Sequence, residues 1–409
     1  QQKVKTMSLI IKLFCGIIMG ILMGIFAPEV IVQCLITIKY IVSQLIKFTI
    51  PLLILFYVTS GIAGLPKNSG KLLGKTVGLA YLSTLGAGLF AYAVASGLFP
   101  VLLHGAGHLP EAHTAIKPFL QLRIPPMMNI MTALTIAFIF GLGISNHDAG
   151  ELRTVSNQGR DIIEMFLNKV MIPALPFYIA GVFADITVKG TVFATLKTFS
   201  LVLLAIIVMH WIWLTIQFCS AGIILRHSPM KILHRMMPAY FTAVGTMSSA
   251  ATVPVTLQQT KRNGVSGPVA NFVVPLCANI HMSGSVISIA GVAVAVMLMS
   301  GTTALPTLLQ ALPFLAMLGI TMVAAPGAPG GAVMASAGLL GSMLGFTEEM
   351  IALQIVLHLA QDSFGTACNV TGDGVIALFI DRMTTHEEIA GDDDLQEAPV
   401  SINDSLYSE

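Results

Sequence analysis

Residues 351–382 read IALQIVLHLAQDSFGTACNVTGDGVIALFIDR, and this stretch decides the fold of the chain. It has the length and the apolar ends of a membrane-spanning helix, yet its middle is polar. At about 100° per residue, one face of that helix collects four polar side chains, those of Asp362, Thr366, Asn369 and Asp373. Ionisable groups are costly at membrane depth, so they usually face a bundle interior or a water-filled path. The stretch therefore predicts a binding helix, although two structural carboxylates bonded to neighbouring helices would give the same pattern.

The composition is that of a polytopic membrane protein. Of the 409 residues, 55% are hydrophobic and only 10% are charged. The mean hydropathy of +0.84 lies far outside the range of soluble domains. The net charge is +1 and no basic run is interleaved with aromatic residues, so nothing predicts binding to nucleic acid. The five cysteines are scattered in apolar stretches without metal-ligand spacing, and we interpret them as small core residues.

Apolar spans before residue 228 predict helices near 8–27, 35–63, 75–104, 124–146, 160–186 and 190–225. Most Lys and Arg of the connections follow the second, fourth and sixth spans. Because basic connections face the cytoplasm, the N-terminus is expected on that side too. We expect a multi-pass protein of the cell (inner) membrane with both termini cytoplasmic. The acidic tail, residues 383–409, is expected to be disordered.

Beyond residue 228 the apolar segments are short and broken by Gly, Pro and Ser. The breaks are GTMSSAATVP (245–254), CANIHMSGS (277–285) and AAPGAPGGA (324–332). Non-helical backbone is tolerated at membrane depth only where it is buried in protein or lines an aqueous cavity. Two re-entrant hairpins and one unwound helix account for all three breaks. The hairpins are approached from opposite sides, which implies inverted repeats, and such interrupted segments are typical of a secondary transporter's binding site.

The charges of this region favour a zwitterionic cargo. Residues 236–260 and 263–381 contain no Lys or Arg, so the predicted site is anionic. Asp362 would hold a substrate ammonium, while hairpin amides and the hydroxyl of Ser248 or Ser249 would meet the substrate carboxylate. A second substrate carboxylate would find no fixed cation.

A cation site is predicted beside the cargo site. Asp373, Asn369 and free carbonyls of the 277–285 break form an all-oxygen environment, which suits sodium rather than zinc. His281, inside the break, is either a hydrogen-bonded packing residue or a proton carrier.

Two other classes of function were weighed against a transporter. An ion channel would need a continuous pore, whereas the polar breaks cluster in the C-terminal half. An intramembrane aspartyl enzyme would need Asp362 and Asp373 to share a proton, but a helix separates them by about 16 Å. We therefore predict a transporter and not an enzyme.

Four motifs in order resemble the dicarboxylate/amino acid:cation symporter family, which includes glutamate transporters, neutral amino acid exchangers and serine/threonine transporters. They are SSAATVPVT (248–256), PLCANIHMSGS (275–285), GAPGGA (327–332) and QDSFGTACNVTGD (361–373). The resemblance implies an all-α fold of eight transmembrane helices plus two re-entrant hairpins. It also implies a homotrimer in the lipid bilayer whose protomers move cargo by an elevator mechanism.

The resemblance divides each protomer into a scaffold and a mobile transport domain. The scaffold would hold helices 1 and 2 (1–74) and an outer loop with helices 4 and 5 (105–186). The transport domain would hold helix 3 (75–104) together with residues 187–382, which span helix 6, hairpin 1, helix 7, hairpin 2 and helix 8.

Site residues are carried over from the family by position. The implied substrate site comprises Ser248, Ser249, Ser285, Gly330, Asp362, Gly365, Thr366 and Asn369. Gly330 would lie at the tip of the gate. One implied sodium site joins Asp373 to backbone of Cys277, His281 and Asn369, and a second uses carbonyls around Asn279, Met322, Val323 and Ala325.

Departures from the family pattern bear on cargo and coupling. Gly365 stands where members with acidic substrates carry Arg, which agrees with the charge argument and leaves room for a neutral side chain. The resemblance then favours a neutral amino acid such as serine, threonine or alanine; the alternative is an acidic amino acid or C4-dicarboxylate symporter.

A further departure concerns the third sodium site of many members. Ser83 and Thr84 keep its hydroxyls, but its Asn and Asp are replaced by His281 and Ser283. Without that carboxylate a third sodium ion would lack its compensating charge. We expect this ion to be absent or replaced by a proton on His281.

Overall fold

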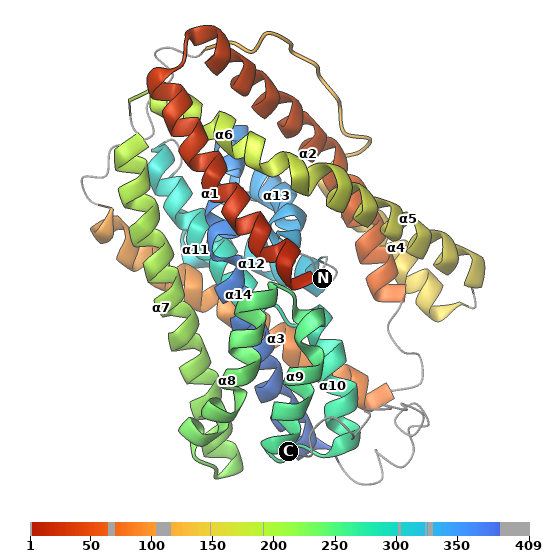
Figure 1. Cartoon of the computed structure of the whole chain (residues 1–409). Coiled ribbons are helices and arrows are strands. Elements are labelled where there is room, and N and C mark those ends of the chain that lie inside the picture. The colour runs from red at the N-terminus through yellow and green to blue at the C-terminus, as the bar shows by residue number, and fades with distance from the viewer. Residues whose placement is uncertain are drawn as a thin grey trace.

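The structure, a computed structural model, is mainly helical and contains no strand in the part of the chain that it describes (Figure 1). The described residues are 2–63, 70–103, 116–147, 149–190, 192–301, 304–323, 325 and 330–384. Most of the tail that was expected to be disordered lies outside them. Six helices among the described residues are long and apolar enough to cross a membrane.

The first half of the chain forms the expected long helices. They are α1 (Gln2–Phe26), α2 (Glu29–Ala63), α3 (Gly70–Leu102), α4 (Ile130–Asn146), α5 (Gly150–Phe166), α6 (Ile172–Val188) and α7 (Val192–Leu225). A short π-helical segment, Leu167–Met171, joins α5 to α6 without interruption.

The starts of five helices in this half differ from the prediction. Helices α1, α2 and α3 begin at residues 2, 29 and 70 rather than near 8, 35 and 75. Helix α4 begins at residue 130 rather than near 124, because Pro125 and Pro126 precede it and the side chain of Asn129 caps it, accepting from the Thr132 amide at 2.7 Å. Helix α5 begins at residue 150 rather than 160. Its first turns are polar, and a hydropathy criterion therefore misses them.

The second half consists of shorter helices and one long one. They are α8 (Pro229–Thr246), α9 (Ser249–Arg262), α10 (Gly267–Ile280), α11 (Ser283–Ser300), α12 (Leu308–Val323), α13 (Gly331–Leu344) and α14 (Glu348–Met383). The first two predicted breaks are confirmed, because the chain leaves the helix at Met247 and Ser248 and again at His281 and Met282. Helix α12 ends at Val323 and α13 begins at Gly331, and most of the third predicted break, residues 324 and 326–329, lies outside the described residues.

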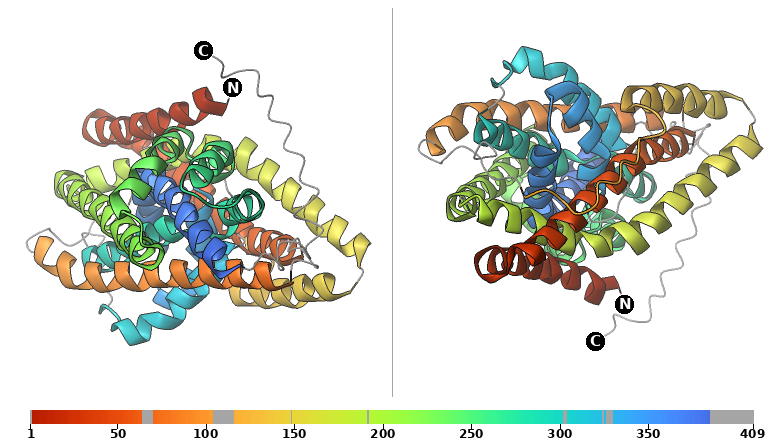
Figure 2. Two further views of the ribbon diagram at one scale, coloured as in Figure 1. Left: turned by 90° about the horizontal axis from the view of Figure 1, so that it is seen from below. Right: turned by 90° about the horizontal axis from the view of Figure 1, so that it is seen from above.

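The helices form two groups by their contacts. In the first helix group, α2 packs against α4, α5 and α6, and α1 packs against α6. In the second helix group, α14 contacts α3, α7 to α11 and α13, and α12 packs against α3 and α13. Figure 2 shows α14 at the centre of this group from below. Helix α14 is buried along almost its whole length, so its polar stripe faces protein and not lipid. The pairs α8/α9 and α12/α13 each pack as two joined helices.

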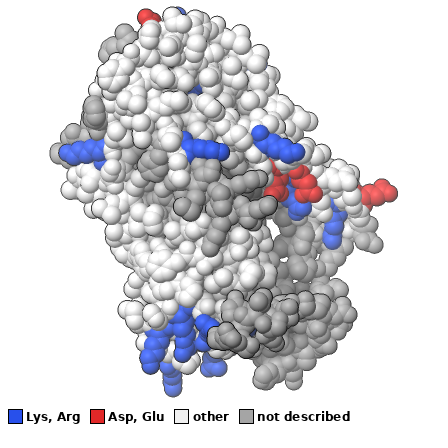
Figure 3. All heavy atoms as spheres, in the orientation of Figure 1, with Lys and Arg blue, Asp and Glu red and all other residues white. Residues whose placement is uncertain are grey.

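Basic side chains gather at the lower end of the molecule (Figure 3). Helix α8 begins and α9 ends there, and these two ends carry four exposed basic residues, Lys231, Arg235, Lys261 and Arg262. The Arg235 guanidinium donates to the Arg262 carbonyl at 3.1 Å, which ties the two helices together at their base.

Candidate functional site

Asp362 lies inside the second helix group and is 5% exposed. One of its oxygens accepts a hydrogen bond from the Gly330 amide at 2.8 Å. The other lies 3.4 Å from Nε2 of His358, whose side chain is fully buried. Among the described residues, no Lys or Arg forms an ion pair with Asp362 or Asp373. Both carboxylates are therefore buried without a Lys or Arg partner in this part of the chain, but each faces a histidine.

Gly330 brings the tip of the α12/α13 pair onto Asp362. Its φ of +76° is a left-handed conformation that side chains rarely adopt. A Cβ there would also come within 2.8 Å of the Leu359 side chain. Because Gly330 directly precedes α13, its amide has no acceptor within the helix and is free to bind the carboxylate.

Asn369 joins α14 to the start of α11. Its side-chain oxygen accepts from the amides of Gly284 at 2.7 Å and Ser285 at 3.2 Å, and its amide nitrogen donates to Ser285 Oγ at 3.0 Å. These are first-turn amides of α11, which have no acceptor within their own helix. Asn369 and Ser285, both predicted to bind cargo, therefore contact each other, and the backbone amides of Gly284 and Ser285 are already hydrogen-bonded to Asn369.

The sequence predicts open space beside Gly365. In the structure, helix α11 fills that space. A Cβ on Gly365 would lie 3.3 Å from Ser288 Oγ and 3.5 Å from the Gly284 carbonyl. A Cβ on Gly284 would lie only 2.3 Å from the Gly365 carbonyl. The two glycines allow the backbones of α11 and α14 to approach, which in turn places Asn369 at the α11 terminus.

Gly284→Ala is expected to lower the stability of the protein by about 1–3 kcal/mol, because backbone atoms must move to admit the methyl group. Thermal unfolding of the purified protein measures this. The matched control is Gly78→Ala at an exposed position of α3, where a Cβ would meet nothing within 4 Å. Since alanine is the better helix former, the control should be neutral or stabilising. Equal midpoints for the two variants would contradict the close approach of α11 and α14.

A second polar cluster surrounds Asp373, which is 1% exposed. Nδ1 of His281 lies 2.9 Å from the Asp373 carboxylate, and its Nε2 lies 3.0 Å from Ser83 Oγ. Gln217 of α7 donates to the same hydroxyl at 3.0 Å. Hydrogen bonds thus connect α14, the α10/α11 break, α3 and α7.

Buried oxygens without a hydrogen-bond partner occur near this cluster. Thr84 Oγ1 and Gln217 Oε1 are two of them. A Cβ on Gly372 would lie 2.8 Å from His281 and 3.0 Å from Gln217 Oε1, so this glycine gives the two side chains their space. Unpaired buried oxygens are the ligands that a small hard cation uses. No group of three or more His, Cys, Asp or Glu in the described part of the chain could hold a metal ion, so a cation here would rely on the single Asp373 carboxylate and on neutral oxygens.

The other predicted cation ligands make contacts within their own segments. The Cys277 carbonyl accepts from the His281 amide at 2.9 Å, at the end of α10. The Asn279 side chain is exposed and donates to the Pro275 carbonyl. The Met322 carbonyl accepts from the Ala325 amide, while Val323 ends α12. Helices α10 and α12, which carry these residues, are in contact.

The remaining predicted cargo residues lie on helices that pack together. Ser248 caps α9, its Oγ accepting from the Ala251 amide at 3.3 Å, and the neighbouring Ser249 is buried. Thr366, also buried, lies one turn beyond Asp362 on α14. Helix α9 packs against α14.

Sequence reasoning missed His358, His210 and Gln217. His358 lies four residues before Asp362 on the same helical face, a spacing that could have identified it. His210 Nε2 lies 2.9 Å from the Gly284 carbonyl and 3.2 Å from Ser288 Oγ, behind Gly365. His210 and Gln217 are single polar residues in the apolar span of α7, and only the packing shows what they contact.

The chain is similar in sequence to known transport proteins over most of its length. A profile of the Sodium:dicarboxylate symporter family matches residues 9–383. The serine/threonine transporter SstT of Streptococcus suis is 28% identical over 300 residues, which are 70% of this chain and 82% of that protein. The serine/threonine transporter SstT of Acinetobacter baylyi is 24% identical over 394 residues, 92% of this chain and 97% of that protein. The similarity thus extends over nearly all of the described helices.

Proposed function

Because the chain belongs to the sodium:dicarboxylate symporter family, we propose that it imports a small neutral amino acid such as serine, threonine or alanine together with sodium. The observation that carries the choice of cargo is the buried carboxylate of Asp362, which has no Lys or Arg partner among the described residues. A buried carboxylate in this state favours a ligand with an ammonium group. The similarity to proteins named serine/threonine transporters supports the same choice.

Cargo binding is coupled to the gate through Asp362. Its carboxylate holds the Gly330 amide at the tip of the α12/α13 pair. A substrate ammonium would compete for the same carboxylate, because a charge-assisted hydrogen bond is stronger than one from a neutral amide. Binding would therefore alter the contact that holds the tip, and α12/α13 would act as the gate.

Sodium would bind at Asp373. The ion would compensate the buried carboxylate, with Asn369 and carbonyls of the α10/α11 break as further ligands. Because Asn369 also caps α11 beside the cargo site, sodium and cargo would order the same segment. This shared residue is the physical basis that we propose for their coupling.

The two helix groups would be a scaffold and a mobile transport domain of an elevator. In support, α13 packs against α2 and α4 of the first helix group, whereas α8 packs against α1. In Figure 1, α8, α9 and α10 extend below the first helix group, as expected if the transport domain is displaced toward its basic end. That basic end would be cytoplasmic, together with both termini. Apolar side chains exposed on α4 and α5 would face lipid or the other protomers of a homotrimer.

An acidic amino acid or C4-dicarboxylate remains the alternative cargo, and it would need a cation for its second carboxylate. Arg235 is exposed at the base of the α8/α9 pair and bonded to the Arg262 carbonyl. It is therefore not available beside Asp362, and the neutral cargo is favoured.

Uptake by proteoliposomes tests the proposal. Labelled serine should accumulate with an inward sodium gradient and not with choline in its place. Aspartate and succinate should fail to compete with it. Sodium-independent uptake, or succinate and aspartate as the better substrates, would overturn the proposed function.

His281 is expected to make uptake dependent on pH. If a proton on its ring replaces a third sodium ion, raising the external pH should slow uptake at limiting sodium, because fewer protons are then available to the imidazole. His281→Asn should flatten this dependence, whereas His234→Asn, at an exposed position of α8, should leave it unchanged. A sodium Hill slope near three with no pH dependence in the unmodified protein would refute the idea.

A further inference from the structure

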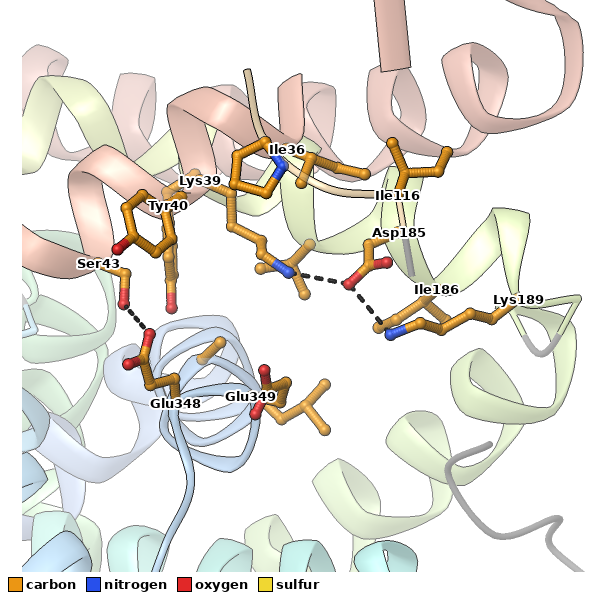
Figure 4. Close-up of a pocket in the computed structure, with 15 residues that line it drawn as sticks. Ile36, Lys39, Tyr40, Ser43, Ile116, Asp185, Ile186, Lys189, Glu348 and Glu349 are labelled. Carbon is orange, nitrogen blue, oxygen red and sulfur yellow. Dashed lines mark hydrogen bonds and ion pairs between the residues drawn. The ribbon is translucent and has the colours of Figure 1, made fainter. Parts of the chain in front are cut away.

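A cavity of about 440 Å³ lies apart from the site described above, between α2, α6 and the start of α14 (Figure 4). It contains none of the residues assigned to cargo or sodium. Helices α2 and α6 belong to the first helix group and α14 to the second, so the cavity has one wall on each. Its volume falls within the range of small-molecule pockets, about 300–1,000 Å³.

The wall formed by α2 and α6 carries a net positive charge. Lys39 Nζ lies 2.8 Å from Asp185 Oδ2, and Lys189 Nζ lies 3.3 Å from the same oxygen. All three side chains are largely buried, at 21%, 17% and 14% exposure for Lys39, Lys189 and Asp185. One carboxylate therefore serves two ammonium groups, and one positive charge is left over.

The wall formed by α14 carries the opposite charge. Glu348 is already engaged, since it forms an ion pair with Lys47 and accepts from Ser43 Oγ at 3.2 Å. Glu349 also lines the cavity but forms no ion pair or hydrogen bond with the described residues. Figure 4 shows Glu349 across the cavity from Lys39, Asp185 and Lys189, with no dashed line joining Glu349 to any of these three. Glu349 is exposed, so a ligand can reach this side from solvent.

The rest of the lining is aromatic and aliphatic. Tyr40 and Ile36 of α2, Tyr178 and Ile186 of α6, and Leu353 of α14 line the cavity as well. A ligand that matches this lining has a negative group at one end, a positive group at the other, and an apolar body.

We propose that this cavity is a second binding site, for a zwitterionic amino acid with an apolar side chain. Its carboxylate would bind Lys39 and Lys189, its ammonium would bind Glu349, and its side chain would pack against Tyr40 and Tyr178. A simple anion or cation would satisfy only one wall. A ligand that joins α2 and α6 to α14 would also restrain the two helix groups against each other and slow transport. That consequence rests on the proposed elevator function, whereas the binding itself does not.

Three probes with the same aromatic ring test the contribution of each charged group of the ligand separately. They are phenylalanine, 2-phenylethylamine, which lacks the carboxylate, and 3-phenylpropionate, which lacks the ammonium. Binding of each labelled probe is measured by equilibrium dialysis on the purified full chain carrying Asp362→Asn, which disables the proposed cargo site. The same measurement is made after adding Glu349→Gln, or after adding Glu151→Gln as a control at an exposed position of α5 outside the cavity.

We expect saturable binding of phenylalanine alone, weakened at least tenfold by Glu349→Gln and unchanged by Glu151→Gln. No saturable binding of phenylalanine, equal binding of all three probes, or indifference to Glu349→Gln would each overturn the second site. In proteoliposomes, phenylalanine should lower the maximal rate of serine uptake, and Glu349→Gln should abolish this effect. A protein that binds phenylalanine in this way but does not take up serine would refute the proposed function and leave the second site standing.

Discussion

Asp362→Asn is expected to weaken cargo binding by about 100-fold, which corresponds to about 3 kcal/mol. The substituted side chain keeps an oxygen for the Gly330 amide but has no charge for the substrate ammonium. Folding should therefore be preserved while transport is lost. Binding is measured calorimetrically with serine in saturating sodium, and thermal unfolding without cargo reports whether the fold is intact.

The control for this variant is Asp161→Asn on α5. Asp161 is exposed and paired with Arg160, an arrangement that contributes little to stability. It should leave binding and uptake unchanged. Serine affinity within threefold of the original in Asp362→Asn would show that the cargo ammonium binds elsewhere.

Asp373→Asn is expected to abolish the stabilisation that sodium gives the protein. A ligand that binds only the folded state raises its unfolding midpoint by mass action. In the unmodified protein, sodium chloride should therefore raise the midpoint relative to choline chloride, and the variant should show no such rise. Without the carboxylate, a sodium ion in this buried cluster would have no compensating charge. Sodium-driven uptake by Asp373→Asn should fall to about 1% or less of the original rate, because losing a buried charge partner costs about 3 kcal/mol.

Asp381→Asn on the same helix provides a contrasting control. Its carboxylate accepts from the amide of Ser266 at 3.1 Å and from the hydroxyl of Ser266 at 2.5 Å, at the start of α10. Loss of these bonds should lower the midpoint in both salts and preserve the difference between them. If Asp373→Asn also preserved that difference, the proposed sodium site would be wrong.

Much of the helical layout follows from local pattern. Clusters of Gly, Pro and Ser at membrane depth located the breaks after Thr246 and after Ile280, because several weak helix formers together favour an interruption. A single such residue does not suffice, since Pro51 lies inside α2 and Gly372 inside α14. The stripe from Asp362 to Asp373 predicted a buried α14, because an ionisable group facing lipid is too costly. The start of α4 was missed although Pro125, Pro126 and Asn129 signal it. The polar first turns of α5 were missed because hydropathy alone was used there.

The contacts between side chains of different helices could not be predicted from the sequence. The Gly330 amide and Asp362, His281 and Asp373, and the walls that place Glu349 opposite Lys39 all join segments far apart in sequence. Helical periodicity assigns each side chain to a face of its own helix but does not specify the helix that packs against it. The close approach of Gly284 and Gly365 depends on backbone positions in two helices at once. Residue order was thus sufficient for a membrane-spanning helical chain with an anionic centre, whereas helix packing selected the partners of each carboxylate and created the second cavity.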